Sequence, residues 1–269
     1  MRFTIAVTTP SFDAGALAYD RAIARASRLF IPALLEAAQI AASQRVLDVA
    51  TGTGLAAEAA ATLVEPSGTV LGVDISLPML REATARTAGG RILLVAMDGQ
   101  ALACKDETFD AVICQLGLMF FADVPRGLQE FRRVLRPGGR LAVCVSCDPE
   151  RTLYGRVAEA ISRRLPAQAD VLNWPARSLD AHRLGRLLDG ADFHEIRVTR
   201  ERREIVFESF DDYWNPVEAG PGAWGPAYRG LPEEARVAVR EEIRQQRSPR
   251  PSDGRLVAEL EYLFGLGRA

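Results

Sequence analysis

Apolar residues near the start of the chain recur at the spacing of a helix. Between Asp20 and Ala42 they lie about 3.6 residues apart, which is the period of one helix face. Pro32 has no amide hydrogen, so we expect it to divide this stretch into two helices. The pattern therefore predicts that residues 1–42 are largely helical and precede the main domain.

From Arg45 the pattern changes to short apolar runs that alternate with helical segments. The runs that predict strands are RVLDVA, TVLGVD, RILLVAMD, FDAVICQLG and RLAVCVS. Between them, helices are expected at about 55–64, from Pro78 to Gly89-Gly90, and at about 125–135. Continuous apolar strands that alternate with helices indicate a parallel sheet covered on both faces. Because crossovers are right-handed, we expect a doubly wound α/β domain.

The pattern is weaker after Asp148. Four further elements are expected: a helix at 179–188, a strand from FHEIRV through REIVFE, a helix at 231–246 and a last strand at 256–266. Residues 211–230 are rich in aromatic residues, glycine and proline, which is typical of an irregular insertion. The sequence thus predicts one domain over residues 43–269, with a late insertion at about residues 201–253.

Charge and hydropathy exclude some classes of partner. The formal net charge is −2, which gives no electrostatic reason to expect a nucleic acid. The most apolar helical stretch contains Pro32, Glu36 and Gln39 and does not predict a membrane span. The first ten residues lack the pattern of a signal peptide, so we expect a cytoplasmic protein. Nothing in the composition indicates the oligomeric state.

A glycine-bearing turn follows the first predicted strand. In VLDVATGTGLAA, Gly52 and Gly54 allow the backbone to turn tightly and to approach a ligand closely. The next helix would point its unpaired amide groups at that ligand. The spacing also fits the dinucleotide fingerprint, so a nicotinamide-dependent dehydrogenase remains an alternative at this point.

Three carboxylates lie at or near the ends of three successive predicted strands. Asp48 precedes the glycine turn, where it would repel a pyrophosphate but attract an ammonium or a sulfonium. Asp74 ends the second strand, where a carboxylate can accept both ribose hydroxyls. Asp98 ends the third strand, where a carboxylate can accept a hydrogen bond from an adenine amine. The set favours a cationic adenosyl ligand over a dinucleotide.

With these motifs the sequence resembles the class I S-adenosylmethionine-dependent methyltransferases. VLDVATGTG is similar to their first motif and LGVDIS to their second, while FRRVLRPGGRLAV is similar to the segment around their fifth strand. The resemblance covers about residues 46–146, and it is strongest to the group of quinone-biosynthesis C-methyltransferases and natural-product methyltransferases. It implies a mostly parallel, seven-stranded Rossmann-like sheet with an antiparallel last strand, and a helical cap over the cofactor.

Carried over position by position, the resemblance implies a site for S-adenosylmethionine. Gly52 and Gly54 would lie at its methionine part, with Asp48 near the ammonium. Asp74 would bind the ribose and Asp98 the adenine amine.

Further positions follow from the same resemblance. Ile75 and Gly99 would lie against the adenine, and Gln115 would line the methyl-transfer site. Tyr19 would contact the methionine end. Ala50 stands where many members have a glycine, and because alanine is small we expect little consequence.

The acceptor side has fewer signals. Phe12, Trp214 and Trp224 are candidate walls of an acceptor pocket between the N-terminal helices and the late insertion. His182 is the candidate general base, ahead of His194, although a sulfonium methyl donor needs no acid for its leaving group.

No pattern of metal ligands is visible in the sequence. The C-x-x-C of Cys144 and Cys147 lies within a predicted strand, so we expect neither a metal nor a redox site there.

These features predict an enzyme that methylates an O, N or C nucleophile of a small, partly aromatic metabolite. Besides the dehydrogenase, two alternatives remain. One is an adenosylmethionine-binding protein without methyltransferase activity, and the other is a methyltransferase that acts on a macromolecule.

Overall fold

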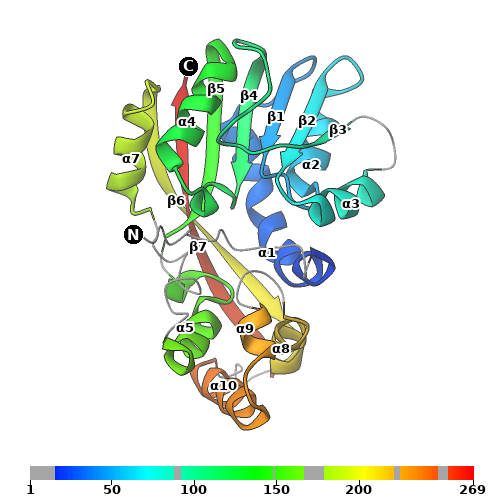
Figure 1. Cartoon of the computed structure of the whole chain (residues 1–269), viewed down its shortest axis with the longest axis vertical. Helices are drawn as coiled ribbons and strands as arrows, with labels where there is room; N and C mark the ends of the chain where they lie inside the picture. Colours follow the sequence, from blue (N-terminus) through cyan, green and yellow to red (C-terminus); the bar gives the residue numbers. More distant parts are fainter. Residues whose placement is uncertain (1–15, 88–91, 148, 167–178, 221–224, 248–253) are drawn as a thin grey trace, which may run out of the picture.

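The computed structural model describes residues 16–87, 92–147, 149–166, 179–220, 225–247 and 254–269 of the chain. The molecule consists of a sheet lobe and a helical lobe, which the long strands β6 (His194–Phe207) and β7 (Leu256–Arg268) connect (Figure 1). No helix within the described residues is long and apolar enough to cross a membrane.

The sheet has seven strands in the order β3-β2-β1-β4-β5-β7-β6. The first five are β1 (Arg45–Val49), β2 (Thr69–Asp74), β3 (Ile92–Ala96), β4 (Phe109–Gln115) and β5 (Leu135–Ser146). They pair in parallel, whereas β7 pairs antiparallel with both β5 and β6. The predicted fold, a mostly parallel doubly wound sheet with an antiparallel last strand, is therefore confirmed.

Helices cover the two faces of the sheet. Side chains of α1 (Ala16–Ala37) and α2 (Leu55–Val64) share one apolar cluster with one face of β1, β2 and β4. Side chains of α4 (Val124–Val134) and α7 (Ala181–Asp189) share a second cluster with the other face. Helix α3 (Leu77–Arg86) connects β2 to the edge strand β3. Each crossover thus buries one face of the parallel strands.

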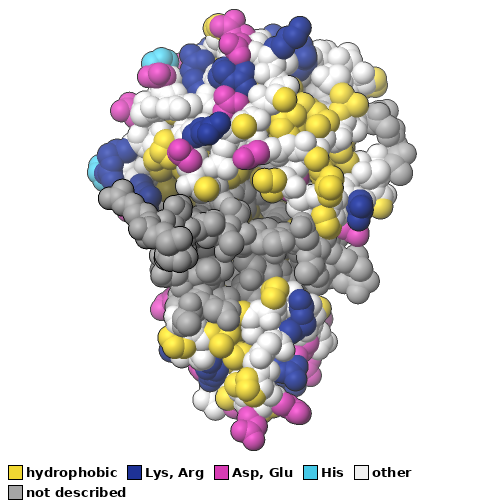
Figure 2. Space-filling model, in the orientation of Figure 1, with side chains coloured by type: hydrophobic (Ala, Val, Ile, Leu, Met, Phe, Trp, Pro, Cys, Tyr) yellow, Lys and Arg dark blue, Asp and Glu magenta, His cyan; other side chains and the backbone are white. Residues whose placement is uncertain are grey.

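The edge strand is less well covered. Leu93 and Val95 of β3 are 65% and 40% exposed. Hydrophobic side chains gather on this side of the sheet lobe (Figure 2). The core of the lobe therefore lies around β1, β4 and β5, whose inward residues are buried on both faces.

Helix α1 is continuous, so the predicted division at Pro32 is wrong. Phe30 and Leu34, on either side of Pro32, are fully buried. Their packing holds the helix together across the position where proline removes one backbone hydrogen bond.

The helical lobe consists of α5 (Gly155–Arg164), α8 (Phe210–Glu218), α9 (Gly225–Arg229) and α10 (Glu233–Gln246) (Figure 1). The expectation of an irregular insertion is therefore wrong for the described parts of residues 211–230 that form α8 and α9. Helix α8 begins after Ser209, whose hydroxyl accepts the amide N–H of Asp212 at 3.1 Å. Phe210, Tyr213, Trp214 and Val217 recur at helical spacing and are all buried. Helix α5 was not predicted, although Val157, Ala160 and Ile161 have the same periodicity.

Trp214 forms the core of the helical lobe. Its side chain is fully buried, its ring stacks on Phe210 with 5.7 Å between centroids, and its Nε1 donates to Glu218 at 2.6 Å. The prediction that it lines an acceptor pocket is therefore wrong, while Phe12 and Trp224 lie outside the described residues.

A buried carboxylate fixes the strands that connect the lobes. Glu261 of β7 is 2% exposed and is bound by three arginines, each about half exposed. Arg200 lies 2.7 Å and Arg202 2.6 Å from its oxygens, and Arg151, of the short 3-10 helix Pro149–Arg151, lies at 3.2 Å. Burial alone raises the pKa of Glu261, but the hydrogen bonds from Arg202 and Arg200 outweigh it and hold this pKa below its ordinary value.

We expect Glu261→Gln to lower the free energy of unfolding at neutral pH by about 1.5–3 kcal/mol, because charge-assisted hydrogen bonds are lost. A lowered folded-state pKa contributes stability above the unfolded pKa, and this contribution disappears as pH falls through the folded pKa. The deficit of the variant, measured by urea unfolding, should therefore shrink in acid. Glu259→Gln is the control, since Glu259 is 55% exposed and lies 3.5 Å from Arg151. Equal losses for the two variants would contradict this account.

Candidate functional site

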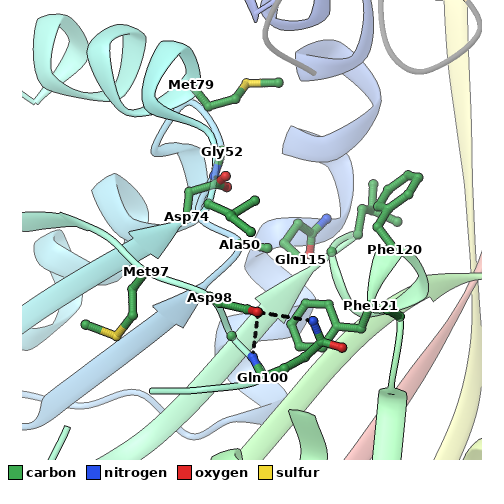
Figure 3. A pocket seen from close by; sticks show the side chains of 15 residues that line it. Ala50, Gly52, Asp74, Met79, Met97, Asp98, Gln100, Gln115, Phe120 and Phe121 are labelled. Carbon is green, nitrogen blue, oxygen red and sulfur yellow. Dashed lines mark hydrogen bonds between the residues drawn. The ribbon is translucent and has the colours of Figure 1, made fainter. Parts of the chain in front are cut away.

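A cavity of about 350 Å³ opens at the carboxyl ends of β1, β2 and β4 (Figure 3). The strand order reverses between β1 and β4, and open α/β sheets bind their ligands at such a point. The lining residues are Ala50, Gly52, Asp74, Ile75, Met79, Met97, Asp98, Gly99, Gln100, Gln115, Leu116, Gly117, Phe120, Phe121 and Ala122.

The turn after β1 forms one wall of the cavity. Ala50 and Gly52 line it with positive φ angles of 55° and 56°. Gly54, with φ 83°, precedes α2 but is not among the lining residues. A Cβ at Gly54 would lie 3.1 Å from Cβ of Ala83 in α3, so this glycine allows the turn to pack against that helix.

Asp74 is held at the end of β2 by two main-chain donors. Its Oδ2 accepts the amide N–H of Gly52 and its Oδ1 that of Ser76, both at 2.8 Å. The next residue, Ile75, is 71% exposed although it is apolar, and it lines the cavity. An oriented carboxylate beside an exposed apolar side chain suits a ligand with hydroxyl groups next to a flat apolar ring.

Asp98 lies two residues beyond β3 and is oriented by Gln100. Its Oδ1 accepts the backbone N–H of Gln100 at 2.9 Å and the side-chain Nε2 of Gln100 at 3.1 Å (Figure 3). Gln100 in turn accepts the backbone N–H of Asp123, at the start of α4, at 2.7 Å. The loop between β3 and β4 is thereby tied to the start of α4.

Gly99 is required by a close contact. A Cβ at this position would lie 2.5 Å from Cζ of Phe121 and 2.7 Å from Cγ1 of Val49. Phe121 also meets Phe131 edge-on, with 5.9 Å between ring centroids. Gly99 therefore allows an aromatic ring to form the floor of the cavity.

Asp48 lies beneath the cavity rather than in its lining. It is fully buried, and its Oδ2 accepts the hydroxyl of Thr51 at 2.6 Å. Burial raises the pKa of Asp48 to about 7; the Thr51 hydrogen bond opposes this shift and the charge of Asp74 adds to it.

Two buried oxygens at this site have no hydrogen-bond partner among the described residues, namely Oδ1 of Asp48 and Oε1 of Gln115. Asp48 pairs with Ile113 of β4, and Gln115 lies two residues further along the same strand. Because side chains alternate along a strand, both point to the face that α1 covers. A buried acceptor without a donor is costly, so this position is suited to a ligand that brings donors.

Three predicted residues, Tyr19, His182 and His194, are not part of the described lining of the cavity. Tyr19 belongs to α1, but its side chain is outside the described residues. His182 is exposed in the first turn of α7 and does not line the cavity, and the same holds for His194 at the start of β6. The structure therefore brings neither histidine to the site.

Several lining residues were not predicted. Phe120 belongs to the 3-10 helix Leu118–Phe120, and with Phe121 it continues the apolar run beyond β4. Gln100, Met79 and Met97 also line the cavity. The run LGLMFF after a strand end was a usable signal for the two phenylalanines, whereas no motif indicated Gln100.

The charged side chains of the described cavity lining are the carboxylates of Asp74 and Asp98, and its amide side chains are those of Gln100 and Gln115. No arginine, lysine or histidine occurs among the described residues that line it. This set does not suit a pyrophosphate, which needs positive charge or free amide groups, but it suits hydroxyl, amine and ammonium groups.

Comparison with known proteins agrees with this chemistry. Residues 47–143 match the model of the family described as "Methyltransferase domain". The demethylmenaquinone methyltransferase of Mycolicibacterium gilvum is 32% identical over 197 residues, which is 67% of this chain and 78% of that protein. The chain belongs to the class I S-adenosylmethionine-dependent methyltransferases. Its cofactor is S-adenosylmethionine, and the dehydrogenase alternative is not favoured.

Two further relatives of this methyltransferase agree with the assignment. The demethylmenaquinone methyltransferase of Corynebacterium kroppenstedtii is 33% identical, with 57% of this chain and 69% of that protein covered. The ubiquinone/menaquinone biosynthesis C-methyltransferase UbiE of Syntrophotalea carbinolica is 37% identical, with 59% and 69% covered.

Solved structures share the fold. Phosphoethanolamine N-methyltransferase 2 of Haemonchus contortus, in complex with S-adenosyl-L-methionine, superposes with a TM-score of 0.61 at 17% identity, covering 98% of this chain and 60% of that one. A putative methyltransferase of Bacillus halodurans reaches 0.56 at 22% identity, covering 88% and 97%. The [4+2]-cyclase SpnF reaches 0.54 at 19% identity, covering 90% and 80%. Because a cyclase also matches, the fold alone does not indicate the reaction.

The side chain that can be accommodated at position 117 is expected to depend on the size of the side chain at position 50. A Cβ at Gly117 would lie 2.4 Å from Cβ of Ala50, and the next nearest atom is Sγ of Cys114 at 3.1 Å. We expect Gly117→Ala to destabilise the methyltransferase by about 1–3 kcal/mol through overpacking. Adding Ala50→Gly should recover most of this loss in urea unfolding. Additive effects in the double-mutant cycle would contradict the contact.

Asp48→Asn should change how stability depends on pH. Between the ordinary carboxyl pKa and about 7 the folded protein binds more protons at Asp48 than the unfolded chain does, so the stability of the cofactor-free protein falls as pH rises. The asparagine variant lacks this fall. We expect it to gain on the order of 2–4 kcal/mol relative to wild type between pH 4 and pH 8, as measured by chemical unfolding. A difference that does not depend on pH would refute the role of burial.

Proposed function

We propose that this methyltransferase moves the methyl group of its cofactor to an O, N or C nucleophile of a small, partly aromatic molecule. The relatives named as demethylmenaquinone methyltransferases support such an acceptor. The observation that carries the proposal is the lining of the cavity. Two carboxylates that can accept hydrogen bonds lie there together with aromatic and apolar side chains. A cytoplasmic location and the absence of a nucleic-acid partner, both expected from the sequence, are part of the same proposal.

The residues of the nucleoside end have distinct proposed roles. Asp74, fixed by two amides, would accept the ribose hydroxyls, and Asp98, oriented by Gln100, would accept the exocyclic amine of the adenine. Ile75 and Gly99 would bound the ring.

The methionine end would use the buried oxygens. Oδ1 of Asp48 and Oε1 of Gln115, which have no donor among the described residues, would accept hydrogen bonds from the ammonium group. Gly52 and Gly54 shape the turn beside it, and Tyr19 of α1 is proposed to contact this end. Bound here, S-adenosylmethionine supplies a methyl group already activated by its positively charged sulfur.

The acceptor is proposed to enter between the two lobes. Phe120 stands on the side of the cavity away from Asp74 and Met79 (Figure 3). An aromatic edge of this kind suits a partly aromatic acceptor. This side would be covered by residues 1–42, as the helical cap, and by the segment of about residues 201–253, which would form part of the acceptor pocket.

The protein's contribution to catalysis would be positioning. Asp74 and Asp98 are the only titratable side chains among the described residues that line the cavity. Holding two reactants in line can lower a barrier by roughly 7–11 kcal/mol without a base or a metal. His182, the histidine predicted as a general base, would then be dispensable.

The test is transfer of a labelled methyl group in excess chelator. We expect label on a short-chain demethylated naphthoquinol or a related phenol, and little on transfer RNA or on denatured protein. His182→Ala should retain activity within about tenfold of wild type, because a general base contributes about 10²–10⁴-fold where one is used. Labelling confined to a macromolecule would overturn the acceptor class. Loss of three orders of magnitude in the histidine variant, with normal cofactor binding, would overturn the base-free account.

A further inference from the structure

Helix α1 contacts both lobes and also approaches the site. Its C-terminal half is fixed to the sheet lobe by Phe30, which is fully buried. The ring of Phe30 meets that of Tyr262 of β7 edge-on, with 4.6 Å between centroids, and that of Phe264 at 6.5 Å. This end of α1 is part of the core.

One turn earlier, Arg25 binds α1 to the helical lobe. Its Nη1 lies 3.1 Å from each carboxylate oxygen of Asp212 in α8, and its Nη2 donates to the carbonyl of Val206 in β6 at 2.8 Å. The guanidinium also lies 4.7 Å from the centroid of the Phe207 ring. One side chain therefore holds the end of β6 and the first turn of α8 at once.

The same turn of α1 approaches the cavity. The carbonyl of Ser27 accepts Nε2 of Gln115 at 3.5 Å, and Ser27 is buried. This contact orients the amide of Gln115, whose Oε1 is one of the two buried oxygens without a partner. Arg25 and Ser27 are two residues apart, so a displacement of this turn would move both contacts together.

We propose that Arg25 is a positioning residue for the cofactor. By fixing α1 to the helical lobe it holds Ser27, and through Ser27 the Gln115 amide, where the ammonium end of the cofactor binds. The helical lobe thus contributes to cofactor affinity without lining the nucleoside site. This inference rests on the proposed function, in which Asp48 and Gln115 receive that ammonium.

The experiment compares two ligands on wild type and Arg25→Ala by calorimetry. S-adenosylhomocysteine has the amino-acid end, whereas 5′-methylthioadenosine has the same adenine and ribose without it. We expect Arg25→Ala to weaken the binding of adenosylhomocysteine about fivefold or more, which is in the range of couplings between sites. The affinity for methylthioadenosine should stay within about twofold of wild type. A general structural defect would instead weaken both ligands.

Arg240→Ala is the matched control. Arg240 lies 2.7 Å from Asp211, the neighbour of Asp212 in α8, but it binds α8 to α10 within the helical lobe. Both ligands should bind this variant as they bind wild type. Asp212→Asn removes the negative charge that Arg25 binds. This variant should show the same selective loss of affinity for adenosylhomocysteine, but a smaller one.

Three outcomes would overturn the proposal. They are equal losses for both ligands in Arg25→Ala, unchanged binding of adenosylhomocysteine in that variant, and an equal loss in Arg240→Ala. If wild type bound the two ligands equally well, the placement of the ammonium would itself be wrong, which distinguishes failure of the proposed site from failure of the role of Arg25.

Discussion

The reversal of strand order between β1 and β4 is the constraint on which the site depends. Crossovers on the two sides of this point leave in opposite directions, so the carboxyl ends of the two strands are not covered by a helix. The turn after β1 and the apolar run after β4 meet there, and Ala50 and Gly117 are close enough that only one Cβ fits between them. The cavity is thus a consequence of topology, and its size depends on small residues.

The carboxylates of the site differ in how their charges are stabilised. Carboxylates at the mouth are held by amide donors, as at Asp74, whereas Asp48 is buried with one oxygen lacking a partner. Such a group is unfavourable in the cofactor-free protein, and burial raises its pKa to about 7. A cationic ligand would remove the penalty. In the proposed site, stability without cofactor and affinity for it would therefore be opposed at this residue, a compromise that is common at functional sites.

Much of the sheet lobe was predictable because its strands are buried on both faces and read as continuous apolar runs. The carboxylates of β1 and β2 and the one after β3 followed from strand ends alone. The helical lobe was harder to predict, because glycine and proline around Trp214 obscured the helical spacing of α8. Gln100 and the contact between Arg25 and Asp212 depend on which loops and helices meet in space, and neither has a local sequence signal.

In the proposed site the cofactor lies in this cavity, with its ammonium at the buried oxygens of Asp48 and Gln115. The most direct measurement is a crystal structure of the protein with S-adenosylhomocysteine. We expect the ribose hydroxyls on Asp74, the adenine amine on Asp98, and the ammonium within hydrogen-bonding distance of Oδ1 of Asp48 or Oε1 of Gln115. A ligand bound elsewhere, or bound here with its ammonium directed away from both oxygens, would show that the proposed site is wrong.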